Sequence, residues 1–341
     1  MSDPTKFTLF RRSNGIWYVI FTEDDHRVWR STKCHLKRDA LKALTTFKHS
    51  IRDRGPSILF SSFTKEFLTY ARTTLRPSTI AGYEQGFKDF LRLAGDLRLH
   101  SVTPREIERF LAAKITQTSE WTARKDYAVL ASAFETARRW KLISENPWRS
   151  VRKPRLRQVL PTFFSVAEFQ ILLTVIRDEQ FRDLCILAIF TGMRMGELCA
   201  LEWSDIDLER KTILVQNKEG FLTKNSRNRI VPLSEVAVSL LRRRAIQPTS
   251  SRVFQRKGEK LTKNYVSKVF KYYVRKAKLN DRLHFHSLRH SAGSLMVQAG
   301  VPIYAVQRIL GHVSIATTQI YAHLQTENLH SEVNKIPIAL N

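Results

Sequence analysis

The sequence predicts a mostly α-helical protein with small β elements: a three-stranded sheet with one helix, then a helical domain, then an α-rich domain that contains a small β-sheet or hairpin. Three observations predict this fold class. A turn-forming Asn-Gly pair precedes an aromatic and β-branched run near the N-terminus. Apolar residues then recur at spacings of three and four, which is typical of amphipathic helices. Two β-branched runs interrupt this helical pattern in the second half of the chain.

Residues 1–55 are expected to form the first sheet and its helix. Asn14-Gly15 is a strong hairpin-turn signal, and Trp17–Phe21 has the composition of a strand, so three short strands are predicted within residues 7–32. A helix should follow, because four apolar residues recur at helical spacing. These are Leu41, Leu44, Phe47 and Ile51.

Residues 57–150 are expected to be helical throughout, with apolar and aromatic residues recurring along four segments. The third segment opens with Thr103-Pro104-Arg105-Glu106, a capping box with proline at the first helical position. Asn146-Pro147-Trp148 is expected to end this domain. The apolar face of the third helix is expected to hold Ile107, Phe110, Leu111 and Ile115.

Residues 162–325 are expected to form the third domain. Ser165-Val166-Ala167-Glu168 is a second capping box, which should open a helix. Thr212–Gln216 and Arg229–Leu233 are β-branched runs that predict two strands joined by a polar, basic connection. Helices are expected on both sides of this hairpin and onward to Tyr321.

The chain carries a large positive charge. Its 341 residues include 57 Lys and Arg against 31 Asp and Glu, a formal net charge of +26. Such an excess indicates a polyanionic partner, and double-stranded DNA is the leading candidate. A membrane surface is the competing polyanion, but no apolar run approaches the length of a spanning helix, and residues 1–4 do not resemble the core of a signal peptide. We therefore expect no membrane partner.

Residues 151–161 form a basic linker that is interrupted by proline. Its cations are Arg152, Lys153, Arg155 and Arg157. Two interpretations stay open: a solvated linker, or a segment that contacts phosphates as it crosses a duplex between two DNA-binding domains.

The three cysteines, Cys34, Cys185 and Cys199, lie far apart and form no CxxC pair. A sparse, odd set is typical of reduced intracellular thiols rather than of a disulfide framework. Cys185 and Cys199 fall in apolar helical runs and are expected in a core. The chain is expected in the cytoplasm, associated with the nucleoid.

Three motifs in the third domain carry residues suited to a reaction at phosphorus. They are Thr191–Leu198, which contains Arg194; His286–His290, which contains Arg289; and Gly311–Tyr321. Two guanidiniums can hold the non-bridging oxygens of a phosphodiester, a tyrosine oxygen can displace one strand end, and a histidine can manage the phenolic proton. Each motif alone has an ordinary explanation: a core tyrosine, histidines that cap or pack, and solvated surface cations.

The combination and order of these motifs resemble the tyrosine recombinase family, the lambda-integrase-like enzymes. Members of this family carry a TGxRxxE box, a lysine eight positions before the proline of a VPL strand, an HxxR box, and a GH pair nine positions before a tyrosine. Here Lys224 lies eight positions before Pro232, and Tyr321 lies nine positions after His312. The resemblance covers residues from about 160 onward and, more loosely, residues 57–150. All six family positions are retained: Arg194, Lys224, His286, Arg289, His312 and Tyr321.

The resemblance implies a helical core-binding domain, a catalytic domain and a covalent mechanism. Tyr321 would attack the scissile phosphate and form a 3′-phosphotyrosyl link, while Arg194 and Arg289 stabilise the charge of the transition state. Because the link conserves the energy of the broken phosphodiester, rejoining would need no ATP.

The resemblance also implies roles for the remaining family residues. Lys224 would protonate the leaving 5′-oxygen, His286 would assist the tyrosine proton, and His312 would donate a hydrogen bond to a phosphate oxygen. Glu197, one helical turn after Arg194, either supports the site from behind or is a bystander carboxylate on the helix surface.

Neither a cofactor nor a metal ion is expected. Fixed cations can neutralise charge at phosphorus in place of metal ions, and no carboxylates at two-metal spacing surround the motifs. His284, His286 and His290 raise the alternative of a zinc site. A third ligand at suitable spacing is not evident, however, and Arg289 between the histidines would repel a dication.

Residues 1–55 resemble, less specifically, the three-stranded arm-binding domains of some phage and transposon integrases. The order of strands and a set of basic residues support this; the alternative is a structural appendage. The basic residues are Arg11, Arg12, Arg27, Arg30 and Lys33.

The expected function is therefore site-specific recombination for a mobile element. Four protomers would assemble on two DNA sites, with DNA-bending accessory proteins and with the tail, residues 326–341, docking on a neighbouring protomer. Two alternatives remain: Xer-type resolution of chromosome dimers, against which the N-terminal module argues, and a DNA-binding regulator that does not cleave.

Overall fold

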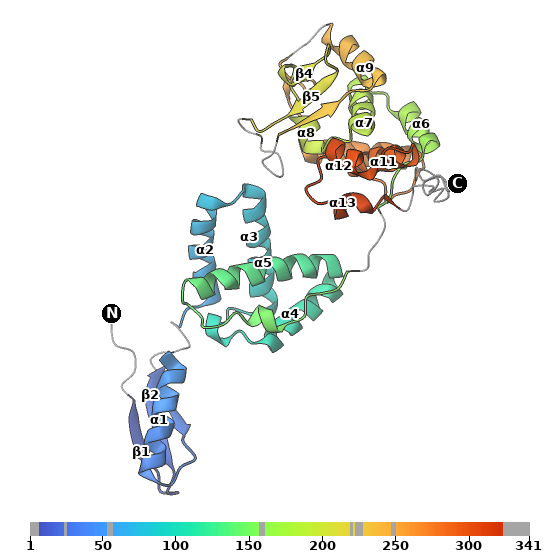
Figure 1. The fold of residues 1–341 in the computed structure, drawn as a ribbon. Coiled ribbons are helices and arrows are strands. Elements are labelled where there is room, and N and C mark those ends of the chain that lie inside the picture. The colour runs from blue at the N-terminus through green and yellow to red at the C-terminus, as the bar shows by residue number, and fades with distance from the viewer. Residues whose placement is uncertain are drawn as a thin grey trace, which may run out of the picture. The chain divides into compact units, whose positions relative to one another are not determined.

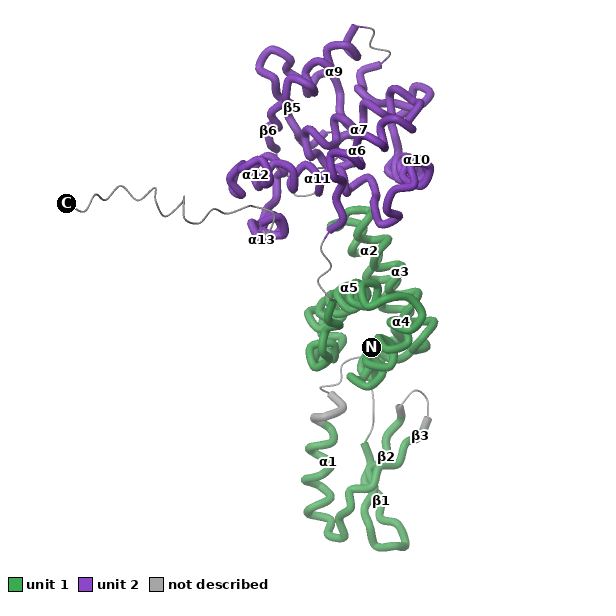
Figure 2. The backbone as a smooth tube through the Cα atoms, turned by 90° about the vertical axis from the view of Figure 1, so that its right-hand side faces the viewer, with its two compact units in different colours: residues 1–158 green, residues 159–341 purple. Residues whose placement is uncertain are grey.

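The computed structural model describes residues 7–23, 26–52, 57–156, 161–218, 221, 228–246 and 250–322. The chain divides into two compact units, residues 1–158 and residues 159–341 (Figure 2). Helices dominate and the sheets are small and antiparallel, as the sequence predicts (Figure 1).

The N-terminal module consists of three strands and one helix. Strands β1 (Thr8–Arg11), β2 (Trp17–Glu23) and β3 (His26–Ser31) pair in the order β1-β2-β3, and helix α1 (Lys37–Arg52) follows. The predicted Asn-Gly turn is present: Asn14 Oδ1 accepts a hydrogen bond from the Ile16 amide at 3.1 Å, and Gly15 has a φ of +77°. One sheet face packs against α1 through Val19, Phe21 and Leu44.

The opposite face of this sheet is exposed and aromatic. Phe10 and Trp29 are 49% and 38% exposed, and their ring centroids lie 5.6 Å apart. The Arg12 guanidinium lies 4.6 Å from the ring centroid of Tyr18 and 4.9 Å from that of Trp29. Cations and aromatic rings therefore share one solvent-facing surface.

Four helices build the helical domain around an aromatic core. They are α2 (Phe60–Thr74), α3 (Pro77–Ala94), α4 (Pro104–Gln117) and α5 (Glu120–Arg139), with 3₁₀ turns at Leu99–Ser101 and Pro147–Ser150. The predicted capping box opens α4, where the Thr103 amide donates to Glu106 Oε2 at 3.1 Å. The largest buried side chains of this core are Phe60, Phe63, Phe90, Phe110, Phe134 and Trp148.

The apolar face predicted for α4 is wrong at one position. Ile115 is 38% exposed, whereas its neighbour Lys114 is only 3% exposed. Lys114 Nζ lies 2.5 Å from Asp89 Oδ2 on α3 and 3.0 Å from Asp126 Oδ2 on α5. Because two carboxylates neutralise the ammonium and Asp89 accepts a hydrogen bond from it, a lysine is tolerated in the interior.

The second unit is α-rich. Its helices are α6 (Val166–Val175), α7 (Glu179–Thr191), α8 (Met195–Cys199), α9 (Glu235–Ala245), α10 (Lys263–Lys276), α11 (Phe285–Gln298), α12 (Ile303–Leu310) and α13 (Ala316–Gln319). The capping box at the start of α6 is present: the Ser165 amide donates to Glu168 Oε2 at 2.8 Å, and Ser165 Oγ accepts from the Glu168 amide at 3.2 Å.

Both predicted strands of this unit are present as β5 (Thr212–Val215) and β6 (Arg229–Pro232). They form a sheet in the order β4-β5-β6 with β4 (Ile206–Asp207), after a 3₁₀ turn at Trp203–Asp205. A second hairpin joins β7 (Gln255–Arg256) to β8 (Glu259–Lys260). The sequence did not predict β4, β7 or β8, because a two-residue strand is too short to show a periodic pattern.

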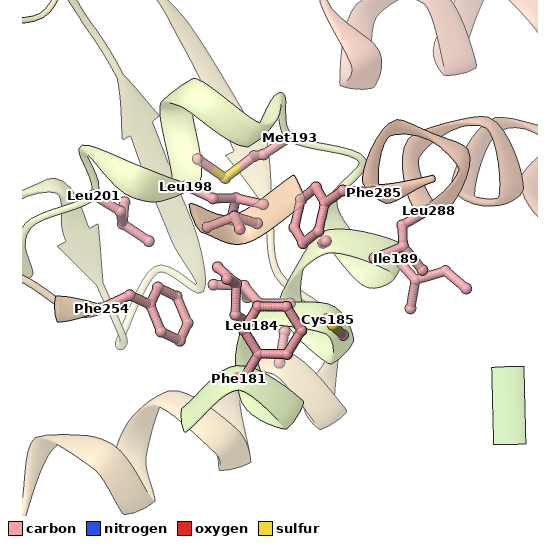
Figure 3. Packing of buried hydrophobic residues seen from close by; sticks show 14 of the residues in the cluster. Phe181, Leu184, Cys185, Ile189, Met193, Leu198, Leu201, Phe254, Phe285 and Leu288 are labelled. Carbon is pink, nitrogen blue, oxygen red and sulfur yellow. The ribbon is translucent and has the colours of Figure 1, made fainter. Parts of the chain in front are cut away.

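Helix α7 lies in the core of the second unit. Figure 3 shows its side chains Phe181, Leu184, Cys185 and Ile189 near residues of α8 and α11. Cys185 and Cys199 are buried, as predicted. A separate, smaller cluster joins α11, α12 and the two residues after α13; its buried members are Val297, Val306, Leu310 and Tyr321.

Candidate active site

Three segments that are distant in sequence meet in the second unit: the α7–α8 turn, helix α11, and the stretch from the end of α12 to Tyr321. Gly192 ends α7 in the left-handed conformation, with φ +60°. A Cβ at this position would collide with Leu310 Cδ2 of α12. Only glycine therefore allows both the turn and the close approach of α12.

Arg194 lies at the N-cap of α8, and its guanidinium is held on two sides. Nη1 donates to Glu197 Oε1 at 2.9 Å, and Nη2 donates to the Gly311 carbonyl oxygen at 2.9 Å. The Arg194 amide donates to Glu197 Oε2, also at 2.9 Å. These bonds fix the guanidinium beside the residue that precedes His312.

Glu197 is buried between two arginines and is not a surface carboxylate. Arg229 of β6 donates to it twice, from Nη1 at 2.9 Å and from Nη2 at 2.7 Å. Burial alone would raise the pKa of this carboxyl. The hydrogen bonds and charge of Arg229, together with Arg194, outweigh burial and lower the pKa to about 2. Glu197 is therefore a permanent anion that links β6 to α8.

Arg289 of α11 is buried and points at the turn that precedes α8. Its Nη1 donates to the Gly192 carbonyl oxygen at 2.6 Å. Its Nη2 is buried and has no hydrogen-bond partner within the described part of the chain. Burial, and then the charge of Arg194, lower the pKa of Arg289 to about 9, so the group is still cationic at neutral pH. An anion bound beside Arg194 would satisfy this guanidinium.

Tyr321 is almost fully buried, at 1% exposure, and its hydroxyl contacts a histidine. The distance from its Oη to His290 Nδ1 is 2.7 Å. Its ring lies against Gly293 of α11, where a Cβ would meet Tyr321 Cε2 at 2.7 Å. Burial raises the pKa of Tyr321 to about 12, although the charge of Arg289 acts in the opposite direction.

The two histidines that the resemblance singles out lie nearby. His286 is exposed, and its ring centroid is 5.0 Å from that of His290. His312 Nδ1 lies 2.8 Å from Thr318 Oγ1. Partial desolvation and neighbouring cations lower the pKa of His286 to about 4 and that of His312 to about 3, so both imidazoles are neutral at pH 7. The Tyr321 hydroxyl contacts His290; that His286 assists the tyrosine proton, as the resemblance implies, stays a prediction.

These groups together form a cationic cluster with one phenol beside it. Arg194 and Arg289 each influence the pKa of His312, and Tyr321 influences that of Arg289, so the side chains lie within range of one another. Fixed guanidiniums of this kind stabilise negative charge that develops on an oxygen without any reorganisation. The arrangement is suited to transfer at a phosphodiester.

Comparison with known proteins agrees with this chemistry. Residues 163–328 match the phage integrase family, and residues 59–115 match the phage integrase N-terminal SAM-like domain. Tyrosine recombinase XerC of Roseiflexus castenholzii is 30% identical over 278 residues, which cover 75% of this chain and 86% of that protein. The chain belongs to the tyrosine recombinase family. It is therefore an enzyme of DNA recombination.

Other recombinases are similar over comparable lengths. Tyrosine recombinase XerC of Bacillus subtilis is 28% identical over 292 residues, 79% of this chain and 94% of that protein. A lambda integrase dimer bound to a COC′ core site has a similar fold, with a TM-score of 0.69 and 19% identity over 94% of this chain and 95% of that chain. The Tn1549 transposon integrase, in complex with transposon right end DNA, has a TM-score of 0.66 and 20% identity over 82% of this chain and 100% of that chain.

The remaining predicted residues of this recombinase lie elsewhere or outside the described residues. Arg152, Lys153 and Arg155 belong to the first unit and are exposed; the Pro154 carbonyl between them accepts a hydrogen bond from Arg124 Nη1 of α5 at 2.9 Å. Lys224, Arg157 and the tail lie outside the described residues.

The described residues contain neither a candidate metal site nor a helix that could span a membrane. No group of three His, Cys, Asp or Glu residues within them could hold a metal ion. None of their helices is long and apolar enough to cross a membrane.

Sequence reasoning missed two residues of the recombinase site. Arg229, the partner of Glu197, stands at the start of the predicted VPL strand, where a charged residue after a basic connection gave no signal of burial. His290 stands in the HSLRH motif, where capping, packing and zinc binding are the explanations that the sequence offers for it. Only the fold brings each of them to its partner.

Proposed function

We propose that this recombinase is a site-specific integrase of a mobile element, which cuts and rejoins DNA through a 3′-phosphotyrosyl link to Tyr321. The observation that carries the proposal is the convergence of Arg194, Arg289 and Tyr321 from three distant segments. The reaction uses neither a metal ion nor ATP.

The proposed roles follow from the geometry and the family resemblance. Arg194 and Arg289 bind the non-bridging oxygens of the scissile phosphate, and the buried Nη2 of Arg289 gains an acceptor in doing so. His312 donates a further hydrogen bond to a phosphate oxygen. Lys224 protonates the leaving 5′-oxygen. Glu197 holds Arg194 in place.

Two observations favour a mobile element over Xer-type dimer resolution. The similarity to XerC of Bacillus subtilis covers 94% of that protein but only 79% of this chain, so this chain has an additional part. The fold of the lambda integrase chain covers 94% of this chain. Xer-type resolution is the second candidate function, because the most similar curated relatives include several proteins named XerC.

The proposed partner is double-stranded DNA, bound by a tetramer on two sites. A solved lambda integrase tetramer bound to a Holliday junction supports this assembly. The exposed aromatic and cationic face of the N-terminal sheet supports binding of accessory arm-type DNA sites. Arg152, Lys153 and Arg155 are exposed and available to phosphates. DNA-bending accessory proteins and action on the nucleoid in the cytoplasm stay predictions.

A nicked suicide substrate made from the DNA that flanks the gene tests the proposal. The wild type should form a covalent protein–DNA adduct on a denaturing gel without Mg²⁺ or ATP. Tyr321→Phe should form none while binding the duplex with unchanged affinity, because only the nucleophilic oxygen is removed. A wild type that binds this site without forming an adduct would favour the regulator that does not cleave.

We also propose that the tail, residues 326–341, docks on a neighbouring protomer. Deleting it should reduce tetramer formation on two DNA sites and leave the binding of one site unchanged. Synapsis at the wild-type level after the deletion would contradict this role.

A further inference from the structure

We propose that His290, rather than His286, accepts the phenolic proton of Tyr321 during strand cleavage. This inference rests on the proposed function. It assigns a catalytic role to a residue that neither the family resemblance nor the comparisons single out.

The contact between the two side chains is direct. Tyr321 Oη lies 2.7 Å from His290 Nδ1, and the two ring centroids are 6.1 Å apart. This distance is within the range that proton transfer to a general base requires. His286 lies one turn earlier on α11 and is solvent-exposed, with its ring centroid 5.0 Å from that of His290.

Burial makes a base at this position necessary. Tyr321 is 1% exposed, so solvent hydroxide has little access to its hydroxyl. At neutral pH the phenol keeps its proton, and the His290 ring is neutral, because burial and the charges of His284 and Arg289 lower its pKa to about 4. A neutral imidazole with Nδ1 unprotonated can accept the hydrogen bond that the phenol donates.

The arrival of DNA would strengthen this base. Arg289 is one of the charges that disfavour a protonated His290, and it is a proposed ligand of the scissile phosphate. An anionic phosphate on this guanidinium offsets its charge and so favours the imidazolium. The charged and titratable groups around His290 are His284 at the N-cap of α11, His286 and Arg289 on α11, His312 after α12, and Tyr321 after α13.

The proposed step balances. The bond from Tyr321 Oη to phosphorus forms, and the bond from phosphorus to the 5′-oxygen breaks. The phenolic proton moves to His290 Nδ1, and the 5′-oxygen takes a proton from Lys224. In rejoining, the 5′-hydroxyl attacks phosphorus and returns its proton to Lys224, the bond from phosphorus to Tyr321 Oη breaks, and His290 returns its proton to the leaving phenolate.

The test compares His290→Asn with the matched variant His286→Asn on the same helix, using rates of adduct formation on the suicide substrate from pH 6 to pH 10. Asparagine keeps a hydrogen-bonding group but does not take up a proton. His290→Asn should slow adduct formation by roughly 10²–10⁴-fold, the usual contribution of a general base, and more than His286→Asn does. Its residual rate should rise about tenfold per pH unit, because the phenol must ionise before it attacks. The wild-type rate should level off instead.

A substrate with sulfur in place of the bridging 5′-oxygen separates the base from the acid. A thiolate leaves without a proton, so this substrate should restore adduct formation by Lys224→Ala and should not restore it by His290→Asn. Three results would overturn the proposal. The sulfur substrate could restore adduct formation by His290→Asn, this variant could form the adduct at a rate within about twofold of the wild type, or its rate could be reduced by the same factor at every pH.

Separate controls distinguish a folding defect from a failure of the proposed function. Thermal unfolding and duplex affinity are measured for each variant, and His290→Gln repeats the test if His290→Asn unfolds. The pH profile of the wild type is a further test of the proposal. A rate of adduct formation that keeps rising up to pH 10 would exclude a general base in the protein. An adduct that persists in Tyr321→Phe would reject the proposed function itself. An adduct that depends on Tyr321 and forms at the wild-type rate in the His290 variants would reject only this inference.

Discussion

Tyr321 combines two roles: it is the proposed nucleophile and a buried member of a hydrophobic cluster. Its position depends on Gly293, because no larger residue leaves room for the ring. The packing that restricts the ring also aims its hydroxyl at His290. At this scale, reactivity and packing are set by the same few contacts.

Gly293→Ala should therefore impair cleavage. A Cβ at this position would lie 2.7 Å from Tyr321 Cε2 and 2.9 Å from Cζ, so the ring must shift. A displacement of about 1 Å in a reacting group can cost roughly 10²-fold in rate. We expect adduct formation to slow by at least about tenfold while duplex affinity stays unchanged. Gly82→Ala in α3 is the control, since its Cβ would meet only Lys125 Cε at 4.0 Å; equal rates in both variants would contradict the prediction.

Glu197 should make the stability of the second unit depend on acid. Its pKa in the folded protein, about 2, lies below the ordinary value of 4.5, so its contribution is fully present above pH 4.5 and is lost as the pH falls toward 2. A shift of this size corresponds to about 3 kcal/mol. Glu197→Gln should be less stable by about this amount at pH 6, and the difference should shrink at pH 3.

Urea unfolding at the two pH values checks this prediction. Glu235→Gln is the control, because Glu235 pairs with Lys211 on the surface, where solvent weakens the interaction. The control should lose much less stability than Glu197→Gln at pH 6. A difference between wild type and Glu197→Gln that stays constant from pH 6 to pH 3 would show that the carboxylate charge is not the cause.

At the scale of elements, buried polar contacts fix the relative positions of helices and strands, which hydrophobic packing alone would allow to vary. In the second unit, Glu197 ties α8 to β6, the strand that follows the segment containing Lys224. In the helical domain, Lys114 ties α4 to α3 and α5. In some proteins, buried ion pairs of this kind specify one arrangement of the elements.

Lys114→Met should destabilise the helical domain strongly. The substitution preserves the apolar stem but removes the ammonium between Asp89 and Asp126, so that among the described residues Asp89 keeps only Arg92, at 3.3 Å, as an ionic partner. Removing one partner of a buried pair costs about 3–5 kcal/mol. Urea unfolding of the full chain measures the change. Arg109→Met on the exposed side of the same helix should change stability by no more than about 0.5 kcal/mol; equal effects of the two substitutions would contradict a special role for Lys114.

At the scale of the whole molecule, the net charge of +26 governs the association with DNA. Each phosphate contact releases condensed counterions, so affinity should fall linearly on a double-logarithmic plot against salt concentration. For roughly 6–10 phosphate contacts, the loss between 50 and 200 mM salt is about 10³–10⁵-fold. Fluorescence anisotropy of a labelled duplex measures the slope. A flat dependence would mean that the basic residues do not carry the binding.

The sequence alone was sufficient for the fold class and for most element positions, because local signals carried them. Caps at Thr103 and Ser165 and the Asn-Gly turn act within a few residues of themselves, and helical periodicity acts within one segment. The family and the list of candidate site residues also followed from the spacing of motifs. Periodicity failed at Ile115 because a buried ion pair, which depends on two other helices, overrode the apolar pattern of α4.

Only the tertiary structure decided which groups meet. Arg229 reaches Glu197 from 32 positions away, Tyr321 reaches His290 from 31 positions away, and Arg194 reaches the Gly311 carbonyl from 117 positions away. No local pattern encodes such contacts, because they depend on how α8, α11 and the stretch after α12 pack together. The burial of Tyr321, and hence its need for a base inside the protein, has the same origin.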